Sequence, residues 1–135
     1  ILRCFHLIGP GQQSNTVLSD WIQQALNADV VQVGDISIER DFLDVRDAVS
    51  AILLLASSKS PVRLANLCSG RSWRLEELLR KAGIENYVVD SGRCRPTEVR
   101  VLRGDNSRLR QEGWEAKIGM DQTLDDLRAS LCARP

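Results

Sequence analysis

The segment DVRDAVSAILLLAS (residues 44–57) has the pattern of a helix that is apolar on almost every side. Asp44 is suited to cap a helix over 45–57, and Asp47 adds negative charge near its positive N-terminal end. Apolar residues then occupy nearly every position from 49 to 56. A helix at a protein surface has a polar face, whereas this one needs cover on most sides. We therefore expect it to lie on a sheet.

Two short apolar segments, 1–5 (ILRCF) and 63–68 (RLANLC), indicate strands that are buried on both faces. Strands of this kind are typical of parallel sheets covered by helices on both sides. A parallel sheet of two strands is not stable alone, so the sequence implies further strands from outside this chain. The chain also begins with Ile1, inside an expected strand, and we interpret it as a piece of a longer protein.

The remaining pattern alternates helices and strands, which is the order of an α/β protein. Further helices are expected after caps at Ser14 or Asn15 (to Asn27), Ser72 (to Gly83), Asn106 or Ser107 (to Gly113) and Thr123 (to Arg134). Further strands are expected at 29–33 and 36–42, joined by a hairpin-like turn at Gly34-Asp35, and at 87–90 and 98–102.

Composition excludes several functions. The 135 residues carry no formal net charge, which argues against non-specific binding to nucleic acid. The four cysteines are widely spaced without a CxxC pair, and the sequence has only one histidine. No metal site is therefore expected. Free thiols of this kind suit a reducing, cytoplasmic location. The longest apolar run, 51–56, is too short to span a membrane.

The sequence offers no catalytic residues. It contains neither GxGxxG nor GxxxxGK[ST], so no loop for a dinucleotide or triphosphate is visible. No serine or cysteine occupies a nucleophile elbow. Tyr87 is the one tyrosine, and Ser91 stands four residues later where a lysine partner would be needed.

Arginine is concentrated between residues 93 and 114, where six arginines face three acids. Guanidinium groups bind phosphate oxygens in pairs, so Arg95 and the distant Arg40 could together clamp a diphosphate. The alternative is that both are surface residues paired with Asp41 or Glu98. The other arginines of the stretch are expected on a solvated strand and helix, with GDNS (104–107) as the cap between them.

Several residues have a structural interpretation. The three tryptophans are expected in the core, and the cysteines at strand ends are expected to act as small core residues. His6 is expected to be a buried, hydrogen-bonded histidine beside the turn at Gly9-Pro10-Gly11.

Five segments in order resemble one family. They are RCFHLIGPGQ (3–12), RDFLDVRDAV (40–49), ANLCSGRSW (65–73), RPTEVRVLRGDNSRLRQEGW (95–114) and TLDDL (123–127). Together they are similar to the C-terminal portion of extended short-chain dehydrogenases/reductases that act on nucleotide sugars. The resemblance is to the branch of GDP-mannose 4,6-dehydratase and GDP-4-keto-6-deoxy-mannose reductase.

The resemblance implies roles for the substrate-binding residues. Arg40 matches the family arginine that contacts the nucleotide diphosphate, and Arg95 matches the arginine that closes over the same phosphates. Glu98 is implied as a nucleotide or sugar contact. Thr16 and Val17 fall in the segment that lines the nucleotide pocket.

The resemblance also places one turn beside the cofactor. His6 and Leu7 fall where the family has a turn next to the nicotinamide and the sugar phosphate, so His6 is implied as a substrate contact and Leu7 as a cofactor contact. The family's GxxGxxG loop and Tyr-x-x-x-Lys pair are missing from this chain. We therefore expect no NAD(P) to bind to this chain alone and no catalysis by it.

The implied fold is an incomplete Rossmann-type sheet with a small mixed α/β substrate-binding subdomain. Residues 1–11 and 37–70 would belong to the cofactor domain, and 12–36 and 71–135 to the substrate-binding subdomain. The implied function is to bind a GDP-linked 4-keto-6-deoxy-hexose within an NAD(P)-dependent dehydratase, epimerase or reductase. The implied partner is the missing cofactor-binding half or a second copy of the chain.

Two alternatives stay open. The chain could be a stand-alone nucleotide- or phosphate-binding module, or a repurposed scaffold that self-associates through its unpaired strands.

Overall fold

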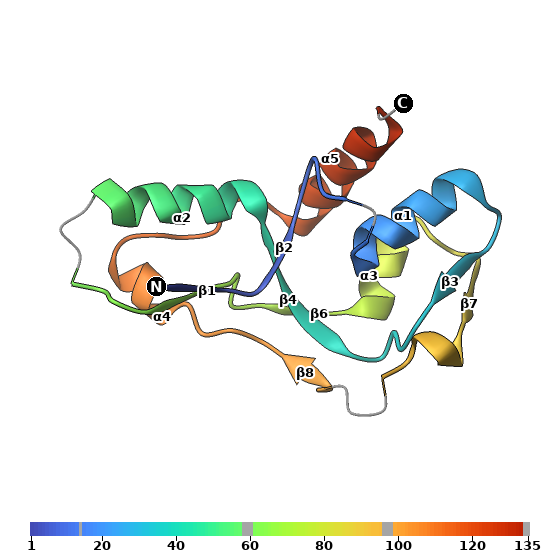
Figure 1. Ribbon diagram of the computed structural model, residues 1–135, viewed down its shortest axis with the longest axis horizontal. Helices are drawn as coiled ribbons and strands as arrows, with labels where there is room; N and C mark the ends of the chain where they lie inside the picture. The colour runs from blue at the N-terminus through green and yellow to red at the C-terminus, as the bar shows by residue number, and fades with distance from the viewer. Residues whose placement is uncertain (14, 58–60, 96–98, 134–135) are drawn as a thin grey trace.

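Parallel strand pairs connect distant parts of the chain in the computed structural model, which describes residues 1–13, 15–57, 61–95 and 99–133 (Figure 1). The parallel pairs are β1 (Leu2–Cys4) with β5 (Ala65–Leu67), β2 (His6–Ile8) with β4 (Glu39–Asp44), and β3 (Val31–Val33) with β7 (Tyr87–Val89). β4 also pairs with β6 (Ser72–Arg74), antiparallel, and with β8 (Val101–Leu102), parallel. The expected α/β class is confirmed.

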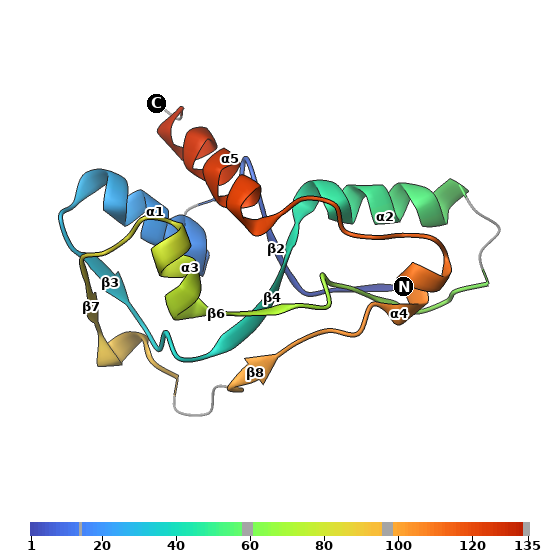
Figure 2. The ribbon, with the colours of Figure 1, turned by 180° about the vertical axis from the view of Figure 1, so that it is seen from behind.

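Helices lie between and beside these strands. They are α1 (Val17–Asn27), α2 (Val45–Ser57), α3 (Leu75–Lys81), α4 (Ser107–Gln111) and α5 (Met120–Cys132), with a short 3₁₀ turn η1 (Ser91–Arg93). The two ribbon views show an elongated molecule: α2 and α4 lie at one end with β1 and β5, and α1 and α3 at the other with β3 and β7 (Figures 1 and 2). β4 runs from one end towards the other. No helix in the described ranges has both the length and the apolar character needed to cross a membrane.

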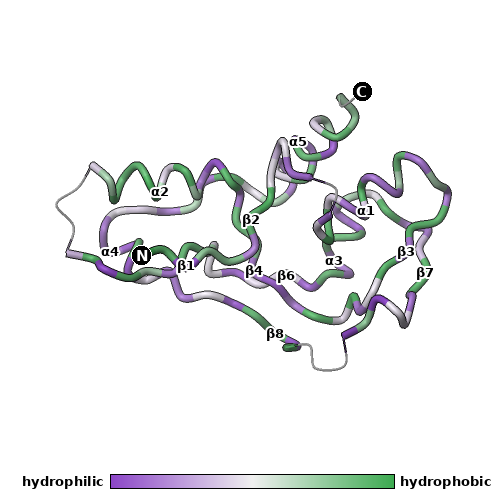
Figure 3. The backbone as a smooth tube through the Cα atoms, in the orientation of Figure 1, coloured by the Kyte–Doolittle hydropathy of each residue, from purple (hydrophilic) through white to green (hydrophobic). Residues whose placement is uncertain are grey.

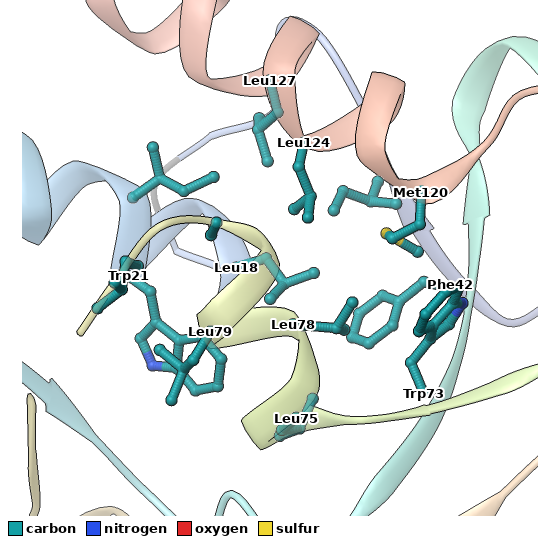
Figure 4. Close-up of a cluster of buried hydrophobic side chains, with 14 of the residues drawn as sticks. Leu18, Trp21, Phe42, Trp73, Leu75, Leu78, Leu79, Met120, Leu124 and Leu127 are labelled. Carbon is teal, nitrogen blue, oxygen red and sulfur yellow. The ribbon is translucent and has the colours of Figure 1, made fainter.

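Two clusters of buried side chains match the two ends of the molecule. The larger joins α1, α3 and α5 and contains Trp21 and Trp73 (Figure 4). The smaller joins β4, α2, β5 and α4 and contains Leu109 and Trp114. The indole nitrogen of Trp114 donates to Ser50 Oγ at 2.9 Å, which fixes the ring against α2. The core positions predicted for the tryptophans are confirmed.

Helix α2 is covered on one face only. Ala48 and Ala51 are buried, whereas Val49, Ile52 and Leu53 expose 49%, 48% and 63% of their surface. These exposed residues follow helical spacing and form an apolar stripe. Figure 3 shows the largely hydrophobic character of α2 as green along its backbone. We call Val49, Ile52 and Leu53 the α2 stripe. The cover that the sequence demands is therefore incomplete within the described chain.

Strand β1 is also less buried than expected. Its parallel pairing with β5 is confirmed, and Ala65 and Leu67 of β5 are buried. Arg3 and Cys4 of β1 are exposed, so the prediction that this strand is buried on both faces is wrong. The physical reason is that, among the described residues, β1 pairs with β5 alone.

The segment GDNS packs against the end of β5. The buried carboxylate of Asp41 accepts hydrogen bonds from Ser69 N at 2.8 Å, Gly70 N at 3.0 Å and Gly104 N at 3.1 Å. The amide of Asn106 donates to Cys68 O at 3.2 Å and to Ser69 O at 3.0 Å. These bonds join three loops at one point. GDNS connects β8 to α4, as the sequence predicts, but the side chain of Asn106 binds these loops and does not cap the helix.

Asp44 links the start of α2 to α5. Its carboxylate accepts from Arg46 N at 2.8 Å, from the Arg46 guanidinium at 2.8 and 2.9 Å, and from Thr123 Oγ1 at 2.7 Å. The predicted cap at Asp44 is therefore confirmed. Burial by itself raises the pKa of Asp44, but the hydrogen bonds from Arg46 and Thr123 outweigh it and hold the pKa below its usual value.

Acid is expected to remove the stability that Asp44 provides. Because its pKa is lower in the folded chain than in the unfolded chain, the contribution is complete above the unfolded value of 3.8 and is lost as the pH falls below it. Asp44→Asn should lower the free energy of unfolding by about 2 kcal/mol at neutral pH. Urea denaturation of both proteins across this pH range checks the prediction: the difference between them should shrink in acid, and a constant difference would contradict it.

Three local predictions are wrong because distant partners override them. Residues 31–33 pair with β7 rather than with 36–42, so Gly34-Asp35 does not join a hairpin. Ser72 lies in β6, where its hydroxyl donates to Glu39 Oε2 at 2.7 Å, and the helix starts at Leu75. Thr123 lies inside α5, which begins at Met120, and does not cap it. The hydroxyl of Thr123 donates to the carboxylate of Asp44 instead.

The remaining differences are smaller. Thr16, not Asn15, caps α1, and its Oγ1 lies 2.7 Å from Ser19 Oγ. Of the cysteines, Cys68 alone is fully buried; Cys94 is half-buried, while Cys4 and Cys132 are exposed. The predicted cap at Ser14 and helix end at Arg134 lie outside the described residues.

Candidate functional site

One pocket of about 530 Å³ collects most of the residues singled out from the sequence. It lies between β2, β4, the start of α1 and the segment around η1. Six of the seven expected site residues line it: His6, Leu7, Thr16, Val17, Arg40 and Arg95. The seventh, Glu98, lies outside the described residues. Side chains from positions 6 to 95 therefore meet at one place.

β2 and β4 form one wall of the pocket. Their parallel register places His6 beside Phe42, with ring centres 5.4 Å apart and planes tilted by 52°. The imidazole is exposed, so the prediction of a buried histidine is wrong. The reason is that residues 6–8 form a strand of their own on the pocket wall instead of leading directly into the turn.

Arg40 is held within the wall of the pocket. It is only 6% exposed, and its Nη1 donates to Glu39 O and to Val99 O, both at 2.7 Å. Asp41, the neighbour considered as its ion-pair partner, instead binds the loops at Ser69 and Gly104. Arg40 is therefore not a surface residue paired with Asp41, and the main-chain oxygens of Glu39 and Val99 anchor its guanidinium.

The opposite side of the pocket is formed by η1 and the residues after it. Arg95 is exposed and lines the pocket together with Arg93 and Cys94. Arg93 Nη1 forms an ion pair with Asp20 Oδ2 at 2.9 Å, which ties η1 to α1. Asp20 also accepts from Gln24 Nε2 at 2.8 Å. This link holds the arginine-bearing segment next to the helix that carries the rest of the pocket.

Sequence reasoning missed part of the lining. The additional polar or small residues are Gln12, Asn15, Asp20, Gly34, Asp35, Arg93 and Cys94. Arg93 and Asp20 are 73 residues apart, so no local sequence pattern predicts their ion pair. Gly34 has a detectable signal, since an added Cβ would lie 2.8 Å from Arg93 O and only glycine permits so close an approach.

A second pocket of about 260 Å³ adjoins the first at the GPG turn. Leu7, Ile8 and Gln12 line both pockets. Gln12 Nε2 donates to Leu7 O at 3.0 Å, while its Oε1 is buried and has no hydrogen-bond partner among the described residues. The two pockets therefore share a wall that contains an unsatisfied acceptor.

No group of three or more potential metal ligands occurs among the described residues. Burial, reinforced by the charge of Asp41, raises the pKa of the Cys68 thiol to about 11, so this thiol stays protonated. Tyr87 packs against the larger hydrophobic cluster. Arg40 and Arg95 both line the pocket, and guanidinium groups suit an anionic ligand.

Known proteins resemble this chain in both sequence and structure. The family model described as "NAD dependent epimerase/dehydratase family" matches residues 1–68, just over half of the chain. A curated relative, GDP-6-deoxy-D-mannose reductase of Pseudomonas aeruginosa, is 37% identical over 136 residues, which covers 92% of this chain and 45% of the relative. The chain thus spans about half the length of this relative.

Solved structures show the same relationship. The structure of RMD from Pseudomonas aeruginosa complexed with NADPH has 34% identity and a TM-score of 0.84, covering 96% of this chain and 47% of that one. UDP-glucose 4-epimerase from Thermotoga maritima, solved with UDP-glucose, has 26% identity and a TM-score of 0.84, covering 97% and 45%. The resemblance to nucleotide-sugar enzymes of the extended short-chain dehydrogenase/reductase type is confirmed, and the chain belongs to the NAD-dependent epimerase/dehydratase family.

Proposed function

We propose that the larger pocket binds a nucleoside diphosphate sugar, specifically a GDP-linked 4-keto-6-deoxy-hexose. The observation that carries this proposal is the buried Arg40, anchored in the wall of a pocket that Arg95 also lines. Two guanidinium groups on separate elements suit the four charged oxygens of a diphosphate, because each can donate two parallel hydrogen bonds. The similarity to a GDP-6-deoxy-D-mannose reductase supports the guanosine nucleotide and the class of sugar.

The other expected residues receive roles around this clamp. Thr16 and Val17, at the start of α1, contact the nucleotide. His6, exposed on β2, donates to a phosphate or sugar oxygen, and Glu98 contacts the nucleotide or the sugar. Leu7 lies where the ligand meets the nicotinamide of a bound cofactor.

The family implies NAD(P), which supplies or accepts hydride at the sugar in an epimerase, dehydratase or reductase. This chain alone does not fit the whole cofactor, because its sequence contains no GxxGxxG loop and no Tyr-x-x-x-Lys pair. Of its residues, Leu7 is the one assigned to the cofactor. We propose that the chain alone binds the substrate without reacting with it.

We further propose that a cofactor-binding partner completes the fold. In this division, residues 1–11 and 37–70 join the cofactor domain, and 12–36 and 71–135 form the substrate-binding subdomain. Two features support it: β1 has one paired edge among the described residues, and the α2 stripe is exposed at the same end of the molecule. A parallel strand and a covering helix from a Rossmann-type half would fill both places.

A second candidate follows from the same open edge, in which two copies of the chain associate. In an antiparallel pairing of β1 with itself centred on Arg3, like charges would face each other, which disfavours this symmetric contact. Light scattering distinguishes the candidates: a strictly monomeric chain excludes self-association, and a stable dimer supports it.

Titration calorimetry of the purified chain tests the proposed function. GDP-mannose is expected to bind with one-to-one stoichiometry, and NADPH is expected to give no saturable heat. Absence of GDP-mannose binding by the folded chain would refute the proposal, and tight NADPH binding would refute the assignment of the cofactor to a partner.

A further inference from the structure

The side-chain amide of Gln12 has one satisfied end and one unsatisfied end. Its Nε2 donates to Leu7 O at 3.0 Å, which fixes the orientation of the amide, because the reverse orientation would place two acceptor oxygens together. Its Oε1 is buried and has no donor among the described residues. A buried acceptor without a donor destabilises the folded chain. A ligand that supplies a donor to this atom removes that cost and so binds more tightly.

The position of Gln12 defines which ligand group can supply that donor. Gln12 lines the larger pocket and the smaller pocket at the GPG turn, and it shares this wall with Leu7 and Ile8. Diphosphate oxygens at neutral pH are acceptors, so they cannot satisfy Oε1. The hydroxyl groups of the hexose are donors, as are the ribose hydroxyls and guanine N–H groups of the nucleotide. The proposed function places the nucleotide at Thr16 and Val17 and the hexose near His6 and Leu7, and Gln12 is hydrogen-bonded to Leu7.

We propose that Gln12 is a specificity-determining residue whose Oε1 accepts a hydrogen bond from a hydroxyl of the bound hexose. This inference rests on the proposed function of the pocket. The terminal torsion of a glutamine side chain is soft, so the proposal requires only that the amide turns its oxygen towards a ligand hydroxyl in the pocket. In this proposal Gln12 contacts the sugar and not the nucleotide.

The test compares GDP-mannose with GDP on the wild-type chain and on Gln12→Met. Methionine keeps the length of the side chain and removes both the acceptor and the donor. The affinity for GDP-mannose should fall about tenfold, while the affinity for GDP should change by less than about twofold. Gln111→Met, at an exposed position of α4, is the matched control and should change neither affinity.

The outcomes separate this inference from the proposed function. Wild-type chain that binds neither GDP nor GDP-mannose overturns the function of the pocket. Wild-type binding of both ligands, with equal losses or no losses in Gln12→Met, overturns the role of Gln12 alone. If Gln12→Met does not fold, the side-chain amide signal of Gln12 in nuclear magnetic resonance spectra of the wild type gives the answer: it should shift with GDP-mannose and stay in place with GDP, and equal shifts overturn the proposal.

Discussion

Replacing Gly104 by alanine is expected to lower the free energy of unfolding by about 3 kcal/mol, the upper end of the usual penalty for overpacking. An added Cβ at this position would lie 2.3 Å from Cys68 Sγ, 2.7 Å from Cys68 Cβ and 2.9 Å from Phe5 Cζ. Cys68 is fully buried at the end of β5, so its side chain has little room to move away from an added methyl group. The loop must therefore move, which also strains the bond from Gly104 N to Asp41.

Gly119→Ala is the matched control, because an added Cβ there meets nothing within 4 Å and its φ of −73° suits alanine. It should lower the stability by no more than about 1 kcal/mol, because alanine is a poorer helix N-cap than glycine. Urea denaturation followed by circular dichroism measures both variants. Equal midpoints for the two would show that the contact at Cys68 does not constrain the loop.

Arg40→Ala is expected to weaken the binding of GDP-mannose by about a hundredfold or more, since removing one member of a buried charged contact costs at least that much. The arginine is buried and anchored to Glu39 O and Val99 O, so its position is set before the ligand arrives. Preorganised donors of this kind contribute more to affinity than mobile surface charges. Arg40→Lys should recover only part of the loss, because lysine keeps the charge and loses the paired donors.

Arg110→Ala is the control for charge alone, because Arg110 is exposed on α4 and lies outside the pocket lining. Calorimetry with GDP-mannose should give the wild-type affinity for this variant. Thermal unfolding of each variant shows whether the chain is folded. An Arg40→Lys chain that is folded and binds as tightly as the wild type would contradict the diphosphate role of Arg40.

The sequence predicts those parts of the fold that depend on neighbouring residues. The cap at Asp44, the helix that follows it and the turn at GDNS are all local patterns, and the structure contains them. The resemblance adds the positions of six pocket residues, which are spread over 90 positions of the chain and cannot be grouped by spacing.

The failures share one physical cause, which is pairing over long separations. The expected hairpin at Gly34-Asp35 gives way to a parallel pairing of β3 with β7, and Ser72 joins a strand because β4 offers it a partner. The ion pair between Asp20 and Arg93 and the bond between Thr123 and Asp44 join residues 73 and 79 positions apart. Local propensity carries no information about such partners.

Helix α2 shows the opposite case: its sequence predicts more burial of apolar side chains than the described residues provide. The pattern of residues 45–57 requires cover on most sides, yet the α2 stripe is exposed. An exposed apolar stripe of this kind is typical of an interaction surface. The sequence thus anticipated a contact surface whose occupant we propose to be the cofactor-binding half.

The most direct test of the account is a map of where GDP-mannose binds, obtained from amide chemical shifts of the 15.1 kDa chain in nuclear magnetic resonance spectra during a titration. The account predicts saturable shifts at the pocket residues His6, Thr16, Asp35, Arg40 and Arg95, with the α2 stripe unchanged. Saturable shifts confined to α2 and α4, or none at all in a folded chain, would contradict it.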